Sequence, residues 1–224
     1  MGKVFVTGAG GFIGSRLASE LLRRGHSVRG LVRPGSRPKL APGCEAVIGD
    51  ALDSSSWVDQ VRGCDTMVHL VGVAHPSPAK AAQFRSLDLA GARAAVAAAT
   101  AAGVKHFVYV SVAHPAPMMH AYIAARTEAE TAIRTSVLSA TILRPWYVLG
   151  PGRWWPYFLM PGYWIAELIP ATRAGARRLG LVRWRQMIGA LADAVDNPPR
   201  GVRVWEVPAI RASSCRSSIE PWLG

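Results

Sequence analysis

Apolar and polar positions along the first two thirds of the chain follow two alternating periods. Short apolar runs of the kind that form buried strands cover residues 4–7, 27–32, 46–49, 66–71, 106–111 and 140–144. Between them, apolar residues recur at helical spacing in residues 13–24, 55–61, 79–102 and 119–136. This rhythm predicts βαβ units, and hence an α/β fold with a doubly wound parallel sheet of Rossmann type. Ligands of such a sheet bind at the carboxyl ends of its strands.

The pattern changes after Arg144. Residues 145–170 contain four of the eight tryptophans and several prolines, and a regular pattern returns only with a helix near 185–195 and a strand near 202–207. We therefore expect a cofactor-binding domain over residues 1–150, a small substrate subdomain that covers it over 151–212, and a loosely held tail over 213–224.

Composition narrows the class of protein. The chain has 224 residues, of which 50% are apolar and 18% are charged, which is typical of a globular protein. Its net charge of +12 attracts anions in general, or only reflects solvated faces, but no basic helix with interleaved aromatics indicates nucleic acid. The three cysteines and the histidines lack metal-ligand spacing, and no signal-peptide pattern precedes the first strand. We expect a cytoplasmic protein with reduced thiols and no metal.

A glycine-rich turn follows the first apolar run and precedes the first helical pattern. Its glycines are spaced Gly8-x-x-Gly11-x-x-Gly14. Glycines at a strand-to-helix turn let backbone N–H groups approach a pyrophosphate at a helix N-terminus, although a tight turn without a ligand is the structural alternative. The segment predicts a dinucleotide site whose candidate residues are Gly8, Gly10, Gly11, Phe12, Ile13 and Gly14.

The end of the second predicted strand indicates which dinucleotide binds. An NAD site usually has an acidic residue there for the ribose 2′-hydroxyl, but this chain has Arg33, followed by Arg37 and Lys39. A guanidinium suits the 2′-phosphate of NADP, so we expect NADP(H) in preference to NAD. A solvated basic loop is the alternative interpretation.

Further motifs give the chain a family resemblance. They are residues 7–14, Gly49-Asp50, residues 69–72 and 103–111, Tyr122-x-x-x-Arg126 with Glu130, and Leu143-Arg144-Pro145 before Gly150-Pro151-Gly152. With them the chain resembles the short-chain dehydrogenase/reductase superfamily, in its extended and atypical branches of epimerase/dehydratase-like and NAD(P)H-binding proteins. The resemblance implies that Asp50 and Ala51 contact the adenine, that Val71 and Gly72 pass the ribose, and that Pro145 lies at the nicotinamide carboxamide.

The same resemblance implies a catalytic group made of a tyrosine acid/base, a serine that polarises the substrate oxygen, and a lysine four residues after the tyrosine. Tyr122 and Ser111 match the first two, but Arg126 stands in place of the lysine. Arginine keeps the positive charge and can anchor a ribose, but its pKa is too high for it to relay protons. Asp88 replaces an asparagine that often supports the relay. Tyr122 as a packing residue and Ser111 as a strand-end cap are the structural alternatives.

Several functions remain open. The leading interpretation is an NADP(H)-dependent oxidoreductase acting on a small apolar carbonyl or alcohol, and an epimerase or dehydratase is its variant. The altered residues at 88 and 126 also fit a non-catalytic NAD(P)H sensor or assembly factor. The aromatic residues of 146–164 suit an apolar substrate pocket, a membrane-surface contact, or ordinary core packing. Prolines interrupt every apolar run, so no span across a bilayer is expected.

Overall fold

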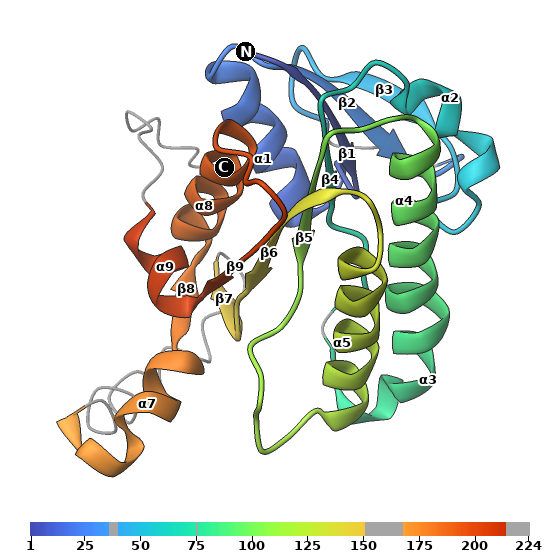
Figure 1. Cartoon of the computed structure of the whole chain (residues 1–224). Helices are drawn as coiled ribbons and strands as arrows, with labels where there is room; N and C mark the ends of the chain where they lie inside the picture. The colour runs from blue at the N-terminus through green and yellow to red at the C-terminus, as the bar shows by residue number, and fades with distance from the viewer. Residues whose placement is uncertain (36–39, 75, 151–167, 214–224) are drawn as a thin grey trace.

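A seven-stranded parallel sheet forms the centre of the molecule (Figure 1). The computed structural model describes residues 1–35, 40–74, 76–150 and 168–213. The sheet has the order β3-β2-β1-β4-β5-β6-β9. Its strands are β1 (Lys3–Thr7), β2 (Ser27–Val32), β3 (Glu45–Ile48), β4 (Thr66–His69), β5 (His106–Val110), β6 (Ser139–Arg144) and β9 (Val202–Glu206). The predicted doubly wound Rossmann-type sheet is confirmed.

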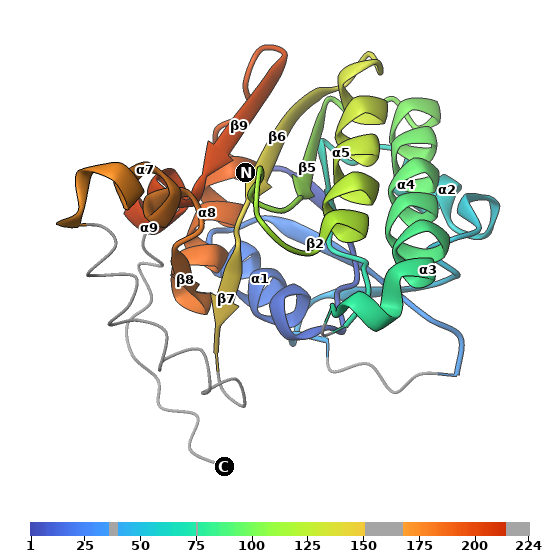
Figure 2. The same cartoon turned by 90° about the horizontal axis from the view of Figure 1, so that it is seen from below.

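Helices cover both faces of this sheet (Figure 2). One face packs against α1 (Phe12–Arg23) and α8 (Trp184–Asp196), and the other against α2 (Val58–Val61), α4 (Ala90–Ala101) and α5 (His120–Arg134). Successive side chains of a strand point to opposite faces, so Val4 and Val6 join the first core while Phe5 joins the second. The central strand β1 is therefore apolar on both faces.

The stretch predicted as one helix over 79–102 is divided. It begins with the 3₁₀ turn η2 (Pro78–Lys80) and the short α3 (Ala81–Gln83), and a π-helical turn, η3 (Phe84–Leu89), leads into α4. The wider turn places Phe84, Asp88 and Leu89 inside the molecule. Another 3₁₀ turn, η1 (Ser54–Ser56), precedes α2.

The C-terminal elements contribute to the main sheet. Strand β9 pairs with β6 in parallel register, and α8 lies beside α1, where Arg24 donates to Asp193 and Asp196 at 2.8 and 2.6 Å. Both elements fall within residues 151–212, the range expected to form a small substrate subdomain, and they pack directly against elements of residues 1–150. Apolar residues on one face of α8 pack against the apolar face of α1 in one buried cluster, and the burial of both faces drives the packing.

Four elements were absent from the sequence prediction. They are β7 (Tyr147–Leu149), β8 (Leu181–Arg183), α7 (Pro170–Arg178) and α9 (Val207–Ala212), and β7 and β8 form a separate two-stranded parallel sheet. Most of the aromatic segment and almost all of the predicted tail, residues 151–167 and 214–224, lie outside the described residues. Within the described ranges, no helix has the length and apolar character needed to cross a bilayer.

Candidate nucleotide-binding site

The glycine-rich turn lies at the carboxyl end of β1. The backbone N–H of Gly11 donates to the carbonyl of Gly8 at 3.0 Å, and α1 begins directly afterwards. A Cβ at Gly14 would lie 2.8 Å from the Cα of Ala9, so only glycine lets α1 pass this close to the turn. No side chain of the described residues caps the start of α1. The first N–H groups of the helix are therefore available to an anion.

A cavity of about 760 Å³ opens beside this turn, at the carboxyl ends of β1 to β4. This volume lies within the usual range for small-molecule sites. Eight of the predicted cofactor residues line it, namely Gly8, Gly10, Gly11, Arg33, Asp50, Ala51, Val71 and Gly72. The structure thus brings together residues from four separate loops of the chain.

Charge along the cavity wall is mostly positive. Arg33 is exposed at the end of β2, and Asp50 is the one carboxylate among the described lining residues. The Oδ1 atom of Asp50 accepts from the N–H of Leu52 at 3.0 Å, which fixes the carboxylate at the end of β3. Arg37, the other predicted phosphate-binding arginine, lies outside the described residues.

Lys80 and Gln83 also line the cavity, and the sequence analysis did not select them. The Nζ atom of Lys80 donates to the carbonyl of Ala74 at 2.6 Å, so the lysine joins the start of the third helical stretch to the loop after β4. Leu52 and Leu87 form an apolar part of the cavity wall. The proline after Ser77 indicates a helix start, but no sequence signal shows that Lys80 and Gln83 face the cavity.

A buried ion pair lies directly behind the cavity wall. Arg126 donates through Nη2 to Asp88, and through Nη1 to the carbonyl of Val110 at 2.8 Å and the hydroxyl of Tyr109 at 3.2 Å. Asp88 also accepts from the N–H of Val73 at 3.1 Å. A Cβ on Gly72 would lie 2.9 Å from the Asp88 carboxylate, so the loop passes in close contact with the pair.

Burial disfavours the charged form of both residues, so it acts on their pKa values in opposite directions. It raises the pKa of Asp88, although the charge of Arg126 opposes this shift. It acts to lower the pKa of Arg126, but the neighbouring tyrosines and the Asp88 carboxylate outweigh it, and the pKa of Arg126 is raised. Arg126 is therefore a permanent cation. Its Nε atom is buried and has no hydrogen-bond partner among the described residues.

Tyr122 lies one helical turn before Arg126 on α5. The guanidinium carbon of Arg126 is 5.1 Å from the centre of the Tyr122 ring, and the Phe84 ring packs on the same tyrosine at 4.9 Å. Tyr122 is half-buried, and its hydroxyl makes no hydrogen bond to a described residue. The structure thus brings two of the three predicted catalytic residues together.

Ser111 is engaged elsewhere. Its hydroxyl donates to Oε1 of Glu130 at 2.6 Å, and Glu130 also accepts two hydrogen bonds from Arg144. No hydrogen bond joins Ser111 to Tyr122 in the part of the chain that the structure describes. Phe12 and Pro145 are not among the described residues that line the cavity. Phe12 stacks with Arg16 at the start of α1, and the Pro145 carbonyl, directly after β6, accepts from the N–H of Ala113 at 3.0 Å. Ile13 packs with the core between α1 and α8.

Sequence comparison agrees with this geometry. Residues 8–151, from the glycine-rich turn to the end of β7, match a family described as NAD(P)H-binding. The chain belongs to this NAD(P)H-binding family. Membership confirms the nicotinamide dinucleotide as the class of ligand, and leaves the choice between NAD and NADP open.

Relatives of this NAD(P)H-binding chain are reductases and epimerases by name. It is 34% identical over 157 residues to a ceramide reductase of Caulobacter vibrioides, a match that covers 67% of this chain and 48% of that protein. It is 34% identical over 117 residues to a 3-beta-hydroxysteroid dehydrogenase of Mycolicibacterium neoaurum, covering 50% and 32% respectively. The chain therefore spans half or less of these two relatives. A sugar epimerase of Bacillus subtilis described as uncharacterized is 34% identical over 155 residues, covering 64% and 71%.

Solved structures of proteins with bound NAD share the fold of this family member. WbmH of Bordetella bronchiseptica in complex with NAD+ aligns with a TM-score of 0.68 at 24% identity, covering 92% of this chain and 75% of that one. A short-chain dehydrogenase/reductase superfamily protein of Agrobacterium tumefaciens with bound NAD aligns at 0.66 and 20% identity, covering 91% and 77%. Together with the family match, these structures confirm the predicted NAD(P)H-binding family and its Rossmann-type fold.

Proposed function

We propose that this protein is an NADP(H)-dependent oxidoreductase that acts on an apolar carbonyl or alcohol. The names of the relatives support this substrate class, since ceramide and a hydroxysteroid are both largely apolar. The observation that carries the proposal is the stacking of Tyr122 with the buried cation of Arg126, next to the loop that lines the nucleotide cavity.

The residues of the cavity fit the pyrophosphate and the adenosine end of the dinucleotide. The turn from Gly8 to Gly11 offers backbone N–H groups to the pyrophosphate, and Asp50 offers an acceptor to the adenine amino group. Val71 and Gly72 would lie along the ribose. Arg33 would bind the 2′-phosphate of NADP, because it lies at the end of β2 where an acid would be needed for NAD.

In the proposed reaction, the bound nicotinamide supplies the hydride that reduces the carbonyl carbon. The Tyr122 hydroxyl donates its proton to the carbonyl oxygen, so the product is an alcohol and the tyrosine becomes a phenolate. The cation of Arg126, whose guanidinium carbon is 5.1 Å from the centre of the Tyr122 ring, stabilises that phenolate. Because Arg126 stays protonated, the proton must return to Tyr122 from water.

Ser111 has a smaller part in this proposal. To polarise a substrate oxygen it would have to withdraw the hydroxyl proton that it donates to Glu130. We therefore assign the main catalytic role to Tyr122, with Ser111 as a further polarising group.

Activity measurements test the assignment directly. NADPH oxidation is followed with a panel of long-chain aldehydes, ketosteroids and quinones, in the wild type and in Tyr122→Phe. Loss of the phenolic hydroxyl should lower kcat by at least about a hundredfold, the usual contribution of a positioned acid. The affinity for NADPH should stay unchanged. Unchanged kcat in Tyr122→Phe would exclude the catalytic role of Tyr122.

Cofactor choice is tested separately by titration calorimetry. Arg33→Asp should lose affinity for NADPH by about tenfold or more and gain affinity for NADH, because a carboxylate repels the 2′-phosphate and accepts from the 2′-hydroxyl. An unchanged ratio of the two affinities would contradict the proposed NADP(H) preference.

A second candidate function is a non-catalytic NAD(P)H sensor. Its supporting observation is that Arg126 and Ser111 each donate a hydrogen bond to an acid of the protein, Asp88 and Glu130 respectively. Tight NADPH binding without turnover of any substrate in the panel would favour this function. Release of an epimerised or dehydrated sugar product without net NADPH consumption would favour the epimerase alternative.

A further inference from the structure

The helical segment before α4 contributes one wall of the nucleotide cavity. Lys80, Gln83 and Leu87 all line the cavity, and their spacing of three and four residues places them on one face of η2, α3 and η3. This face changes in character along its length, because Leu87 is apolar, Gln83 is a neutral amide and Lys80 is a cation. None of the three has a role in the proposed reaction.

A hydrogen bond positions the ammonium group of Lys80. Its Nζ atom donates to the carbonyl of Ala74 at 2.6 Å, and Ala74 lines the same cavity. An ammonium group has three N–H donors, and this bond uses one of them. The other two remain for an anion in the cavity, because Nζ has no further hydrogen bond to a described residue. Lys80 is half-buried, so solvent and salt screen its charge less than that of a fully exposed lysine.

The order of the strands indicates which phosphate of a dinucleotide lies closest to Lys80. The glycine-rich turn follows β1, which lies between β2 and β4 in the sheet. Arg33 follows β2, whereas Lys80 is bonded to the loop that follows β4. That loop is in contact with the turn, since a Cβ on Gly8 would lie 3.1 Å from the carbonyl carbon of Leu70. Arg33 and Lys80 therefore belong to opposite sides of the turn.

We propose that Lys80 binds the pyrophosphate of the dinucleotide. The backbone N–H groups of the turn bind the pyrophosphate from the end of β1, and the ammonium group of Lys80 binds it from the side of β4. Arg33, on the side of β2, is left to the 2′-phosphate. A lysine suits this task, because its compact charge and rotatable donors need no fixed fork geometry. The inference rests on the proposed dinucleotide site and does not require the reaction at Tyr122.

Titration calorimetry of the full chain with NADPH and with NADH tests the proposal without any substrate. Lys80→Gln removes the charge and keeps a side-chain N–H donor. It should weaken the binding of both nucleotides by about tenfold, the usual effect of losing a charge-assisted hydrogen bond, because both contain the pyrophosphate. The ratio of the two affinities should stay unchanged, whereas Arg33→Asp should change it. Lys80→Arg keeps the cation and should stay within about threefold of the wild type.

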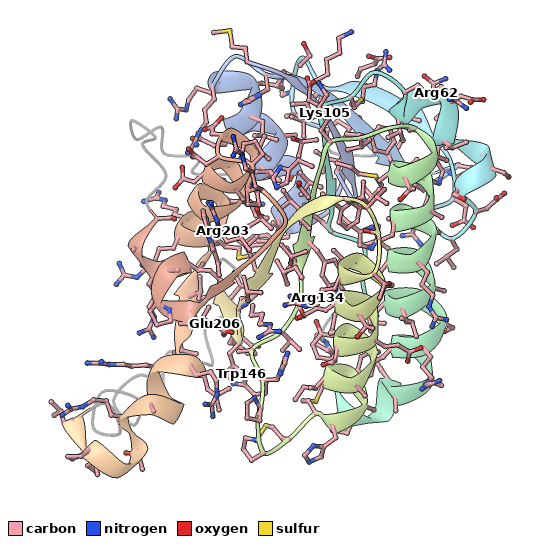
Figure 3. The ribbon with its side chains drawn as sticks, viewed as in Figure 1. Arg62, Lys105, Arg134, Trp146, Arg203 and Glu206 are labelled. Carbon is pink, nitrogen blue, oxygen red and sulfur yellow. The ribbon has the colours of Figure 1, made fainter. Side chains whose placement is uncertain are left out.

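A matched control removes the same charge from the opposite edge of the sheet. Lys105 is exposed and directly precedes β5, and Figure 3 shows it at the other end of the molecule from the segment labelled α3 in Figure 1. Lys105→Gln should change either affinity by less than about twofold, because charges beyond a Debye length are screened. Urea unfolding should give the same midpoint for Lys80→Gln and the wild type.

The outcomes separate this proposal from its alternatives. Equal loss of affinity in Lys80→Gln and Lys105→Gln would show a general effect of net charge and overturn the proposal. A loss confined to NADPH would place Lys80 at the 2′-phosphate and overturn the pyrophosphate assignment. An equal loss in Lys80→Arg and Lys80→Gln would show that only the bond to Ala74 matters. Unchanged affinities in Lys80→Gln would overturn the role of Lys80 alone, whereas a wild type that binds neither nucleotide would refute the proposed function as well.

Discussion

Gly72 separates the nucleotide cavity from the buried Asp88–Arg126 pair. It lines the cavity on one side, and on the other its Cα lies so close to the pair that a Cβ would overlap Arg126 and lie 2.9 Å from Asp88. The neighbouring N–H of Val73 is held by the same carboxylate. The ion pair is thus a positioning device for the loop that we expect to contact the ribose.

Gly72→Ala should therefore weaken both binding and stability. The added methyl separates Asp88 from Arg126 or pushes the loop into the cavity, and we expect NADPH affinity to fall at least about tenfold and the free energy of unfolding by about 3 kcal/mol. Gly91→Ala is the control, since its Cβ would meet Leu52 at 3.5 Å, an ordinary contact. Calorimetry and urea unfolding measure both effects. Equal behaviour of the two variants would remove the positioning role.

His69 is a buried titratable group of the core. Its Nδ1 atom lies 2.9 Å from the Thr7 hydroxyl, and its Nε2 atom has no partner among the described residues. Burial, aided by the charge of Arg126, lowers the pKa of His69 to about 3. His106 is similar, with burial lowering its pKa to about 4.

These shifts predict how stability depends on pH. The folded state keeps both histidines neutral, whereas the unfolded chain binds protons below pH 6.5, so stability falls as pH drops from 6.5 toward 3. Between pH 7.5 and 5.0 each histidine should lower the free energy of unfolding by about 2 kcal/mol. His69→Asn, which can keep the bond to Thr7, should reduce that pH-dependent loss by about 2 kcal/mol in urea titrations. An undiminished loss would show that His69 is charged when folded.

A single carboxylate, that of Glu130, connects one helix and two strands of the fold. Glu130 of α5 accepts from Ser111 at the end of β5 and from Arg144 of β6, which in turn reaches Glu206 at the end of β9. Burial acts to raise the pKa of Glu130, but the hydrogen bonds from Arg144 and Ser111 outweigh it and hold the pKa below its usual value. Glu130 therefore stabilises the contact between the helix and the sheet as a charged group.

Glu130→Gln should lower the free energy of unfolding by about 3 kcal/mol at pH 7, because it leaves Arg144 without its main partner in a largely buried position. Glu128→Gln on the same helix, whose partners Arg85 and Arg93 are exposed, should cost less than about 1 kcal/mol. The difference should shrink as the pH falls below the usual pKa of a glutamate, and it should vanish once the carboxylate of Glu130 is protonated in the folded state as well. A difference that does not shrink on acidification would contradict the electrostatic explanation.

Helices and strands can be predicted from the sequence where the apolar residues follow a single period, that of a helix or that of a strand. All six strands of the first 144 residues were predicted within about two residues, because each is a short apolar run bounded by polar residues or glycine. The three-residue strands β7 and β8 have no such pattern and arise only from their pairing with each other. Likewise, the alanine-rich pattern before Gly103 gives no sign of the π-helical turn that buries Asp88.

The candidate site was predictable where a motif fixes local geometry. The glycine-rich turn and the ends of β2, β3 and β4 were selected correctly as neighbours, because parallel strands bring their carboxyl ends to one edge. The partner of Arg126 could not be predicted from the sequence. Asp88 is 38 residues away, and the pairing depends on how α5 packs on η3. The direction of the Ser111 hydroxyl depends on Glu130 in the same way.

For the whole molecule, the central question is whether residues 1–150 form an independent unit. The core on one face of the sheet is built jointly by α1 and α8, with Leu17 and Leu21 from the first helix and Ile188 and Leu191 from the second. Strand β9 covers the edge of β6 over its full length. The C-terminal elements therefore complete the core of the cofactor domain.

A fragment of residues 1–150 should consequently fail to fold cooperatively. It would expose the apolar face of α1, leave β6 as an open edge and lose the pairs that Arg24 makes with Asp193 and Asp196. Residues 1–213, which retain α8 and β9, serve as the control and should unfold at the same urea concentration as the full chain. Circular dichroism in urea measures both. A single sharp transition of the short fragment, with a midpoint equal to that of the full chain, would instead establish residues 1–150 as a domain of their own.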